Sequence, residues 1–334
     1  MKKALIDVPV YIIFFNRPDT LEKVFESVKE ARPSKLFLVA DGPRDERADD
    51  VQKIEECKKV VENIDWECEV HRNYSDVNLG CGKRMYTGIS WAFEYVDRLI
   101  IIEDDCVLSQ DFYPFCEELL ERYKDDERIF KINAMNHLGV YDKTPNSYFF
   151  ADGGCCGWAT WRRAWKNVDY EMGFYEDKYS LNCLEKKYKH SASAIKACGI
   201  RLEAYKNGAK LSSWTNQMGI SFRLQGQVAI VPKGNMITNI GLGNDSTHSV
   251  NSIKKLPNRL KKIFYAEPVK MDFPLKHPKY IIEDYDYIEA VEKTLGNSFI
   301  DRTSMRIGSL IKQIIYANKG DLKTMAKKIF KVGK

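Results

Sequence analysis

The chain has 334 residues, with 52 Lys and Arg against 47 Asp and Glu, and 44% of the residues are hydrophobic. This composition is typical of a globular protein and excludes a disordered or collagen-like chain. The length exceeds what one core usually reaches, so we expect two fused domains or one large domain with an appendage. The nine cysteines show no CxxC spacing, which favours a reduced cytosolic protein over a disulfide framework.

The N-terminus is basic and then apolar, but it does not predict a signal peptide. Asp7 and Pro9 interrupt the apolar stretch, and no small-residue cleavage site follows it. No segment reaches the roughly 18 apolar residues that a membrane-spanning helix needs. We therefore expect a cytoplasmic protein.

The first hundred residues alternate strand and helix patterns. We predict strands at 9–15, 35–40, 67–72 and 98–102, and helices at 20–30, 45–61 and 79–96. Such alternation predicts an α/β fold with a parallel, doubly wound sheet. In that fold the ligand binds beyond the carboxyl ends of the strands.

The second half is less regular, and it shows no internal repeat. We predict strands at 148–156 and 228–231, and helices at 184–205 and 216–224. No GxGxxG follows the first strand and no GxxxxGK[ST] occurs in the chain. These absences argue against dinucleotide-binding and P-loop proteins.

Three consecutive acids, Glu103, Asp104 and Asp105, end the apolar strand at 98–102. Their mutual repulsion favours a bound cation, and carboxylate oxygens suit Mg²⁺ or Mn²⁺. The alternative is that the three acids cap the helix that follows. A strand-terminal triplet is an unusual cap, so we favour a metal site.

Two further segments at strand ends carry candidate binding groups. Asp41 lies in an Asp-Gly-Pro turn and could also accept the imide N–H of uracil. Lys83 and Arg84 lie in the first turns of a predicted helix that glycines open. A helix N-terminus with two cations can bind an anion, although a solvated basic helix start is the alternative for both residues.

Six stretches resemble bacterial nucleotide-sugar transferases of the GT-A fold: FNRPDTL, VADGPR, GCGKRMYTGISWAF, IIEDDCVLSQDFYPF, GWATWRRAW and PKGNMITNIGLGNDSTH. They are also similar to the eukaryotic N-acetylglucosaminyltransferase that starts complex N-glycans. The resemblance spans about residues 8–280. It implies a Rossmann-like mixed or parallel sheet flanked by helices, with a nucleotide-sugar-binding half at 1–125 and an acceptor-binding half at 126–285.

The resemblance assigns roles to the acid triplet. It makes Asp105 the metal ligand, places Asp104 at the ribose or near the metal, and turns Glu103 toward the donor sugar. His248, near the end of the resembling region, would return toward the metal, although an exposed loop histidine is the alternative. The implied cofactor is Mn²⁺ or Mg²⁺.

The resemblance also assigns a nucleotide pocket. Asn16 and Arg17 would line it, and Asp41 would bind the base. Lys83 or Arg84 would approach the diphosphate of the donor.

An inverting transfer needs a carboxylate base for the acceptor hydroxyl, and here the chain departs from the family. Relatives tend to place an Asp beside the position of Trp214, whereas this chain has Ser and Thr there. Asp152 is our first substitute, with Glu176 and Asp177 behind it, although each could be a plain turn or surface acid. We also expect Trp158 to contact a sugar through its ring face, with a core position as the alternative.

The final segment, 286–334, is predicted to be helical, basic and amphipathic. From residue 302 onward it carries nine basic residues and one acid, whereas the preceding residues carry 43 basic and 46 acidic ones. Apolar faces opposite basic ones are typical of a helix on an anionic membrane, where each Lys or Arg adds roughly 1 kcal/mol. The alternative is helices docked on the catalytic domain or on a second subunit.

Together these features predict a metal-assisted, inverting glycosyltransferase at the inner face of the cell membrane. It would move a sugar from a UDP-sugar, such as UDP-N-acetylglucosamine or a relative, to a polysaccharide or lipid-linked oligosaccharide. The alternatives are a catalytically inactive saccharide- or nucleotide-binding scaffold and a sugar nucleotidyltransferase, although the first strand lacks the glycine-rich loop of the latter. Because the body of the chain is net acidic, we do not expect nucleic-acid binding.

Overall fold

The computed structural model describes residues 1–188, 191–209, 211, 214–241 and 265–295. By its internal contacts the chain divides into two units, 1–291 and 292–334. The predictions for His248 and for the basic tail from residue 302 lie outside the described residues.

Within the described ranges, eight strands form the main sheet, in the order β3-β2-β1-β4-β8-β6-β9-β7. Their bounds are β1 (Val10–Phe14), β2 (Lys35–Ala40), β3 (Glu69–Tyr74), β4 (Arg98–Glu103), β6 (Ile129–Asn133), β7 (Tyr148–Ala151), β8 (Trp158–Trp161) and β9 (Val228–Pro232). Strands β3, β2, β1 and β4 are parallel, whereas β8 runs antiparallel to β4 and β6. A second, antiparallel sheet pairs β5 (Cys106–Leu108) with β10 (Ile237–Asn239).

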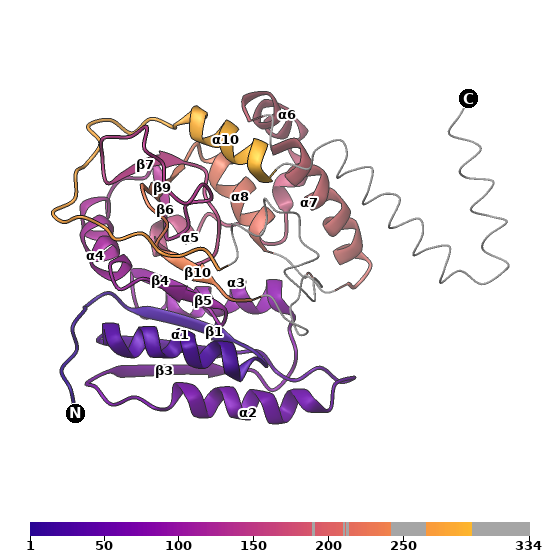
Figure 1. Cartoon of the computed structure of the whole chain (residues 1–334). Helices are drawn as coiled ribbons and strands as arrows, with labels where there is room; N and C mark the ends of the chain where they lie inside the picture. Colours follow the sequence, from indigo (N-terminus) through magenta and orange to yellow (C-terminus); the bar gives the residue numbers. More distant parts are fainter. Residues whose placement is uncertain (189–190, 210, 212–213, 242–264, 296–334) are drawn as a thin grey trace. The chain divides into compact units, whose positions relative to one another are not determined.

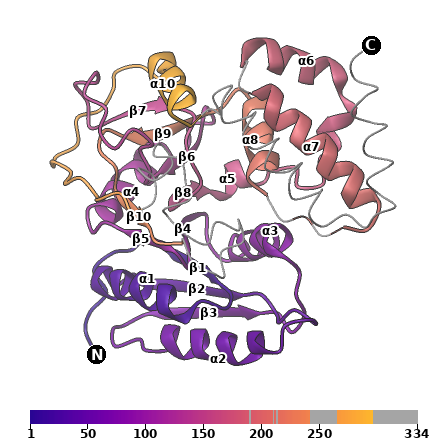
Figure 2. The same cartoon turned by 45° about the vertical axis from the view of Figure 1, so that its right-hand side comes forward.

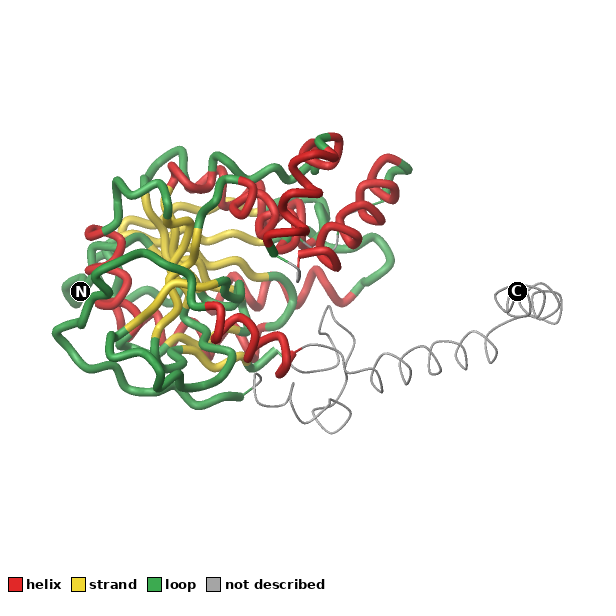
Figure 3. The backbone as a smooth tube through the Cα atoms, turned by 90° about the horizontal axis from the view of Figure 1, so that it is seen from above, coloured by secondary structure: helices red, strands yellow, loops and turns green. Residues whose placement is uncertain are grey.

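Helices surround these strands, which gather in the interior when seen from above (Figure 3). The bounds are α1 (Pro18–Ala31), α2 (Asp49–Val61), α3 (Cys81–Ala92), α4 (Phe112–Arg122), α5 (Arg162–Trp165), α6 (Lys178–Lys187), α7 (Ser191–Lys206), α8 (Thr215–Leu224) and α10 (Tyr285–Leu295). Helices α1 and α2 lie beside β1–β3, whereas α6, α7 and α8 form a separate group (Figures 1 and 2). None of the described helices is long and apolar enough to cross a bilayer.

The parallel strands β1, β2 and β4 are largely apolar on both faces because helices cover both, whereas the edge strand β3 is mostly polar. In β1, Val10, Ile12 and Phe14 pack into the core that includes residues of α1 and α2. Tyr11 points to the other face and packs with residues of α3, as the alternation of side chains along a strand requires. The carboxyl ends of β1, β2, β3 and β4 therefore meet at one edge, as the sequence predicts.

The α/β fold class is confirmed, with differences concentrated in the second half. The predicted helix at 184–205 is two helices, α6 and α7, and the predicted strand at 148–156 ends at Ala151. We missed β6, whose apolar run is broken by the buried Lys131. Strands β4 and β8 pair, so the two predicted halves share one sheet.

Candidate functional site

The acid triplet lies where β4 ends, beside the end of β1. Arg17 forms an ion pair with Asp104 and places its Nη1 3.0 Å from Asp105 Oδ2. The backbone N–H of Phe15 donates to Asp104 Oδ2 at 3.2 Å. Burial raises the pKa of Asp104, and the charge of Arg17 opposes that shift. Arg17 therefore holds two carboxylates of the triplet together.

One guanidinium does not balance three carboxylates. Burial raises the pKa of Glu103 well above its usual range, and the charge of Asp105 adds to the shift. Carboxylate oxygens are hard ligands that suit Mg²⁺ or Mn²⁺. In the described part of the chain no three His, Cys, Asp or Glu side chains surround one metal position, so these acids could supply only part of a coordination shell.

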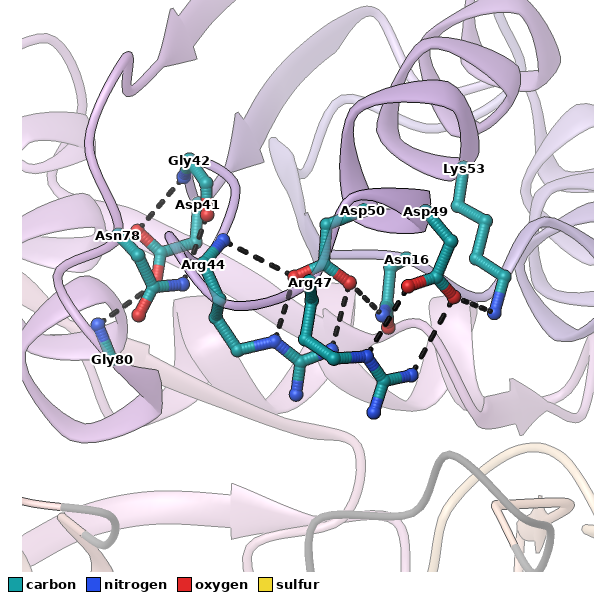
Figure 4. A network of polar contacts seen from close by, with 10 residues as sticks. All are labelled: Asn16, Asp41, Gly42, Arg44, Arg47, Asp49, Asp50, Lys53, Asn78 and Gly80. Carbon is teal, nitrogen blue, oxygen red and sulfur yellow. Dashed lines mark hydrogen bonds and ion pairs between the residues drawn. The ribbon is translucent and has the colours of Figure 1, made fainter.

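Asp41 joins the end of β2 to the start of α3. Its carboxylate accepts the backbone N–H groups of Leu79, Gly80 and Gly42 at 2.8, 2.9 and 3.0 Å. The side chain of Asn78 donates to it at 3.3 Å (Figure 4). These four bonds account for its burial without a ligand, and its predicted contact with the base stays a prediction.

Lys83 and Arg84 have different environments at the start of α3. Arg84 is buried, donating from Nε to Ala40 O and from Nη2 to Asn73 Oδ1, both at 2.9 Å. It thereby ties the ends of β2 and β3 together, which corrects the expectation that Arg84 approaches a diphosphate. Lys83 is exposed, and it is the cation of this pair that remains open to an anion.

Asn16 belongs to a polar network that the sequence analysis missed in part (Figure 4). Its Nδ2 donates to Asp50 Oδ1 at 2.7 Å, and the guanidinium of Arg44 binds both oxygens of Asp50 at 2.6 and 2.7 Å. These bonds to Arg44 lower the pKa of the fully buried Asp50. Arg44 also lies 5.1 Å above the ring of Phe15. The available signal was Asp50 itself, an acid inside the helix predicted at 45–61 that the structure places in the first turn of α2.

A second region is a cavity of about 230 Å³ between β6, the turn after β7, and α8. Its lining includes polar and charged side chains, namely Lys131, Asp152, Cys155, Thr215, Asn216 and Arg223. Asp152 forms an ion pair with Arg223. The first substitute for the missing base therefore lies in the same cavity as Thr215, where the sequence lacks the expected Asp.

Lys131 is fully buried in β6. A register shift in the strand between Ile129 and Lys131 places Lys131 on the same side as Phe130, which stacks on Phe222 of α8. Such a bulge re-aims a side chain. The ammonium donates to Gly154 O at 2.6 Å, to Gly153 O at 3.2 Å and to Cys155 Sγ at 3.6 Å. Burial lowers the pKa of Lys131.

A chain of polar contacts connects the two regions. The thiol of Cys106 donates to Asp105 Oδ1 at 3.3 Å. Asn239 Nδ2 lies 3.8 Å from Cys106 Sγ and 3.6 Å from Cys156 Sγ, and Cys156 follows the cavity residue Cys155. Gly241 also lies against the triplet, because a β-carbon there would fall 2.1 Å from Asp105 Oδ2. The turn after β7 therefore lines the cavity and is linked to the triplet through Asn239 and Cys106.

Three predicted residues do not line the cavity. Trp158 is fully buried and stacks on Trp214 at 5.7 Å, so its ring is closed to a sugar, and the predicted contact is wrong. Asp177 is exposed and caps α6 by accepting the backbone N–H of Ser180 at 2.9 Å. Glu176 is exposed beside it. Neither acid lines the cavity.

Comparisons with known proteins identify the class of this chain. The sequence profile of glycosyl transferase family 2 matches residues 10–183. No curated protein sequence matches the chain. A solved structure of UDP-glucose pyrophosphorylase complexed with UDP-glucose is 10% identical, with a TM-score of 0.24, covering 45% of this chain and 64% of that one. A 4-diphosphocytidyl-2C-methyl-D-erythritol synthase from Anaerococcus prevotii is 12% identical, with a TM-score of 0.30, covering 66% and 96%.

Proposed function

The chain belongs to glycosyl transferase family 2, and from that premise we propose that it transfers a sugar from a UDP-sugar to a saccharide or lipid-linked acceptor. UDP-N-acetylglucosamine or a relative is the proposed donor. The resemblance to the N-acetylglucosaminyltransferase of N-glycans motivates that choice of donor.

The observation that carries the proposal is the acid corner, defined as Glu103, Asp104, Asp105 and Arg17. It lies at the edge where the parallel strands end, which is where this class of sheet binds ligands. Asp41 fixes the start of α3 at the same edge, and Lys83 is exposed in the first turn of that helix. A nucleoside diphosphate would meet a helix N-terminus and a cation there.

The acid corner fits a divalent cation in its donor chemistry. Its carboxylates outnumber its guanidinium, and the raised pKa of Glu103 reflects burial and neighbouring negative charge. Asp105 and Asp104 would hold the ion, which would offset the charge of the leaving diphosphate. Arg17 keeps the two carboxylates in place.

Asp152 is the proposed base. Its ion pair with Arg223 fixes its carboxylate at the wall of the cavity. Asp152 would take the proton of the acceptor hydroxyl as the acceptor oxygen bonds to C1 of the sugar and the bond from C1 to the diphosphate breaks. Attack from the face opposite the leaving group inverts the anomeric carbon.

Donor binding and turnover test the proposal directly. The protein is incubated with a panel of UDP- and GDP-sugars with and without Mn²⁺, and the melting temperature and slow donor hydrolysis are measured. We expect a UDP-sugar to raise the melting temperature and to be hydrolysed, both more strongly with Mn²⁺. If none of the donors binds, the proposal is wrong.

A catalytically inactive scaffold is the second candidate, because Ser213 and Thr215 flank Trp214 where relatives tend to carry an Asp on one side. The panel of UDP- and GDP-sugars described above distinguishes the transferase from the scaffold. A scaffold would bind a UDP-sugar without hydrolysing it or transferring it to any acceptor.

Membrane association is proposed for the basic segment 302–334 from its sequence. Each Lys or Arg near an anionic surface adds about 1 kcal/mol of attraction. Deletion from Arg302 onward should leave UDP binding intact while releasing the protein from anionic vesicles in a flotation assay. Equal flotation of both chains would contradict the proposal.

A further inference from the structure

We propose that the cavity bounded by Lys131, Asp152, Cys155 and Arg223 binds an acceptor saccharide that carries an anionic substituent, such as the carboxylate of a uronic acid. The inference deepens the proposed function and rests on it, because it names the chemical class of the acceptor. The juxtaposition that carries it is a buried ammonium at the wall of a polar cavity, with no carboxylate partner in the part of the chain that the structure describes.

The charge of Lys131 is not matched by a carboxylate among the described residues. All three of its hydrogen bonds go to neutral groups, namely two backbone carbonyls and the Cys155 thiol. A buried cation without a counter-charge is costly to desolvate. An anion that enters the cavity would offset part of that cost.

The other charges of the cavity cancel each other. Asp152 and Arg223 form an ion pair, so the charged side chains of the described lining sum to one positive charge. Arg223 is positioned by that pair with 9% of its side chain exposed. The cavity therefore favours an anion over a neutral or cationic ligand.

The contact between Lys131 and Cys155 provides a route for such an anion. It is the longest of the three contacts, at 3.6 Å, and a thiol sulfur is a weak acceptor. Cys155 also lines the cavity. A carboxylate that approaches from the cavity could take this hydrogen bond and leave the two carbonyl bonds intact.

The remaining lining suits a saccharide. Thr215 and Asn216 at the start of α8 bring a hydroxyl and an amide to the cavity, and such groups exchange hydrogen bonds with sugar hydroxyls. Asp152 lies in the same lining, so an acceptor held there would place a hydroxyl near the proposed base. The volume of about 230 Å³ is below the range of drug-sized pockets, roughly 300–1,000 Å³, so we expect the cavity to hold one sugar ring of a longer chain.

The test compares probes that differ in charge. Methyl β-D-glucuronide and methyl β-D-glucoside differ only at C6, and glucosamine and glucose 6-phosphate complete the set. Their dissociation constants for the full chain are measured by ligand-observed NMR. We expect the glucuronide to bind at least about tenfold more tightly than the glucoside, and the cationic glucosamine to bind most weakly.

Variants assign the preference to the cavity. Lys131→Met should abolish the preference for the glucuronide, whereas Lys131→Arg should retain part of it. Lys143→Met is the matched control, because Lys143 is exposed and pairs with Asp286, and it should change nothing. Tight binding of glucose 6-phosphate would also support an anion site and show that it accepts phosphate as well as carboxylate.

Several outcomes would overturn the inference. Equal binding of the glucuronide and the glucoside to the wild type contradicts it, even if Lys131→Met fails to fold. A preference that survives in a folded Lys131→Met protein contradicts it as well, and so does the absence of glucuronide binding at any attainable concentration.

The melting-temperature shift with UDP is measured on the same preparations and reports on the acid corner. If the protein binds UDP but does not distinguish the sugars, the proposed function stands and this inference is wrong. If the protein binds the glucuronide but no nucleotide, the proposed function is wrong.

Discussion

The acid corner and the cavity carry opposite charge excesses on the two sides of one turn. The corner has three acidic side chains and one guanidinium, Arg17, which pairs with Asp104 and Asp105, whereas the cavity has a buried Lys131 beside a neutral ion pair. Each excess motivates one proposal, a cation with a diphosphate for the first region and an anionic saccharide for the second. The charge of each region therefore differs from that of the other, and the net charge of +5 for the whole chain does not show this difference.

The largest effect that would sharpen this contrast is expected at the corner. Asp105→Ala should abolish the Mn²⁺-dependent part of UDP binding, because the variant removes the carboxylate beside Arg17 that we assign to the metal. The melting-temperature shift with UDP and Mn²⁺ measures it. Asp142→Ala is the control, because that acid is 85% exposed and forms only a long ion pair at 3.8 Å. If Asp105→Ala bound UDP and Mn²⁺ as the wild type does, the assignment of the metal to this corner would be wrong.

The cavity should affect turnover rather than donor binding. Asp152→Asn should lower kcat by about 100-fold or more, the usual range for a general base, and leave UDP binding unchanged. Asp177→Asn, at an exposed helix cap, should have kcat close to that of the wild type. Steady-state transfer assays with a matched acceptor compare the three proteins. If Asp152→Asn has the kcat of the wild type, Asp152 is not the base and another residue must act in that role.

The network behind the corner should contribute to stability. Asp50→Asn removes a buried carboxylate that accepts from Asn16 and Arg44, and it should lower the free energy of unfolding by about 2 kcal/mol. Urea denaturation measures the loss. Asp49→Asn, on the exposed side of the same helix turn, should cost much less. Equal losses in the two variants would show that the buried network adds nothing.

The last prediction concerns the pH dependence of stability near the cavity. Burial and the charge of Lys131 lower the pKa of His137 from 6.5 to about 4, so the unfolded state binds the additional proton between these values. The stability contributed by neutral His137 is complete above pH 6.5 and is lost as the pH falls toward 4. Melting temperatures across this range should fall more steeply for the wild type than for His137→Gln. Parallel curves would contradict the assignment.

The two regions also differ in what the sequence could predict. The corner follows from local patterns, since apolar strands end in charged residues and parallel strands bring those ends together. Position alone could not show how the residues are used. Asp41 and Arg84, which the resemblance assigns to the nucleotide, bond to backbone groups in the structure, and only the folded contacts reveal this.

The cavity was largely beyond prediction. Lys131 interrupts an apolar run, and only the register shift in β6 turns it toward α8. Asp152 was a candidate among three acids, and its pairing with Arg223, far along the chain, distinguishes it. Trp158 had the residue type and the neighbouring glycine expected of a sugar contact, yet stacking with Trp214 places it in the core. Contacts between residues distant in sequence decided each of these cases.

A crystal structure of the protein with UDP and Mn²⁺ tests the central claim most directly. Anomalous scattering should place manganese within coordination distance of Asp105 and of a diphosphate oxygen, with the nucleotide along the carboxyl ends of β1, β2 and β4. Manganese elsewhere, or a nucleotide bound away from that edge, would contradict the account.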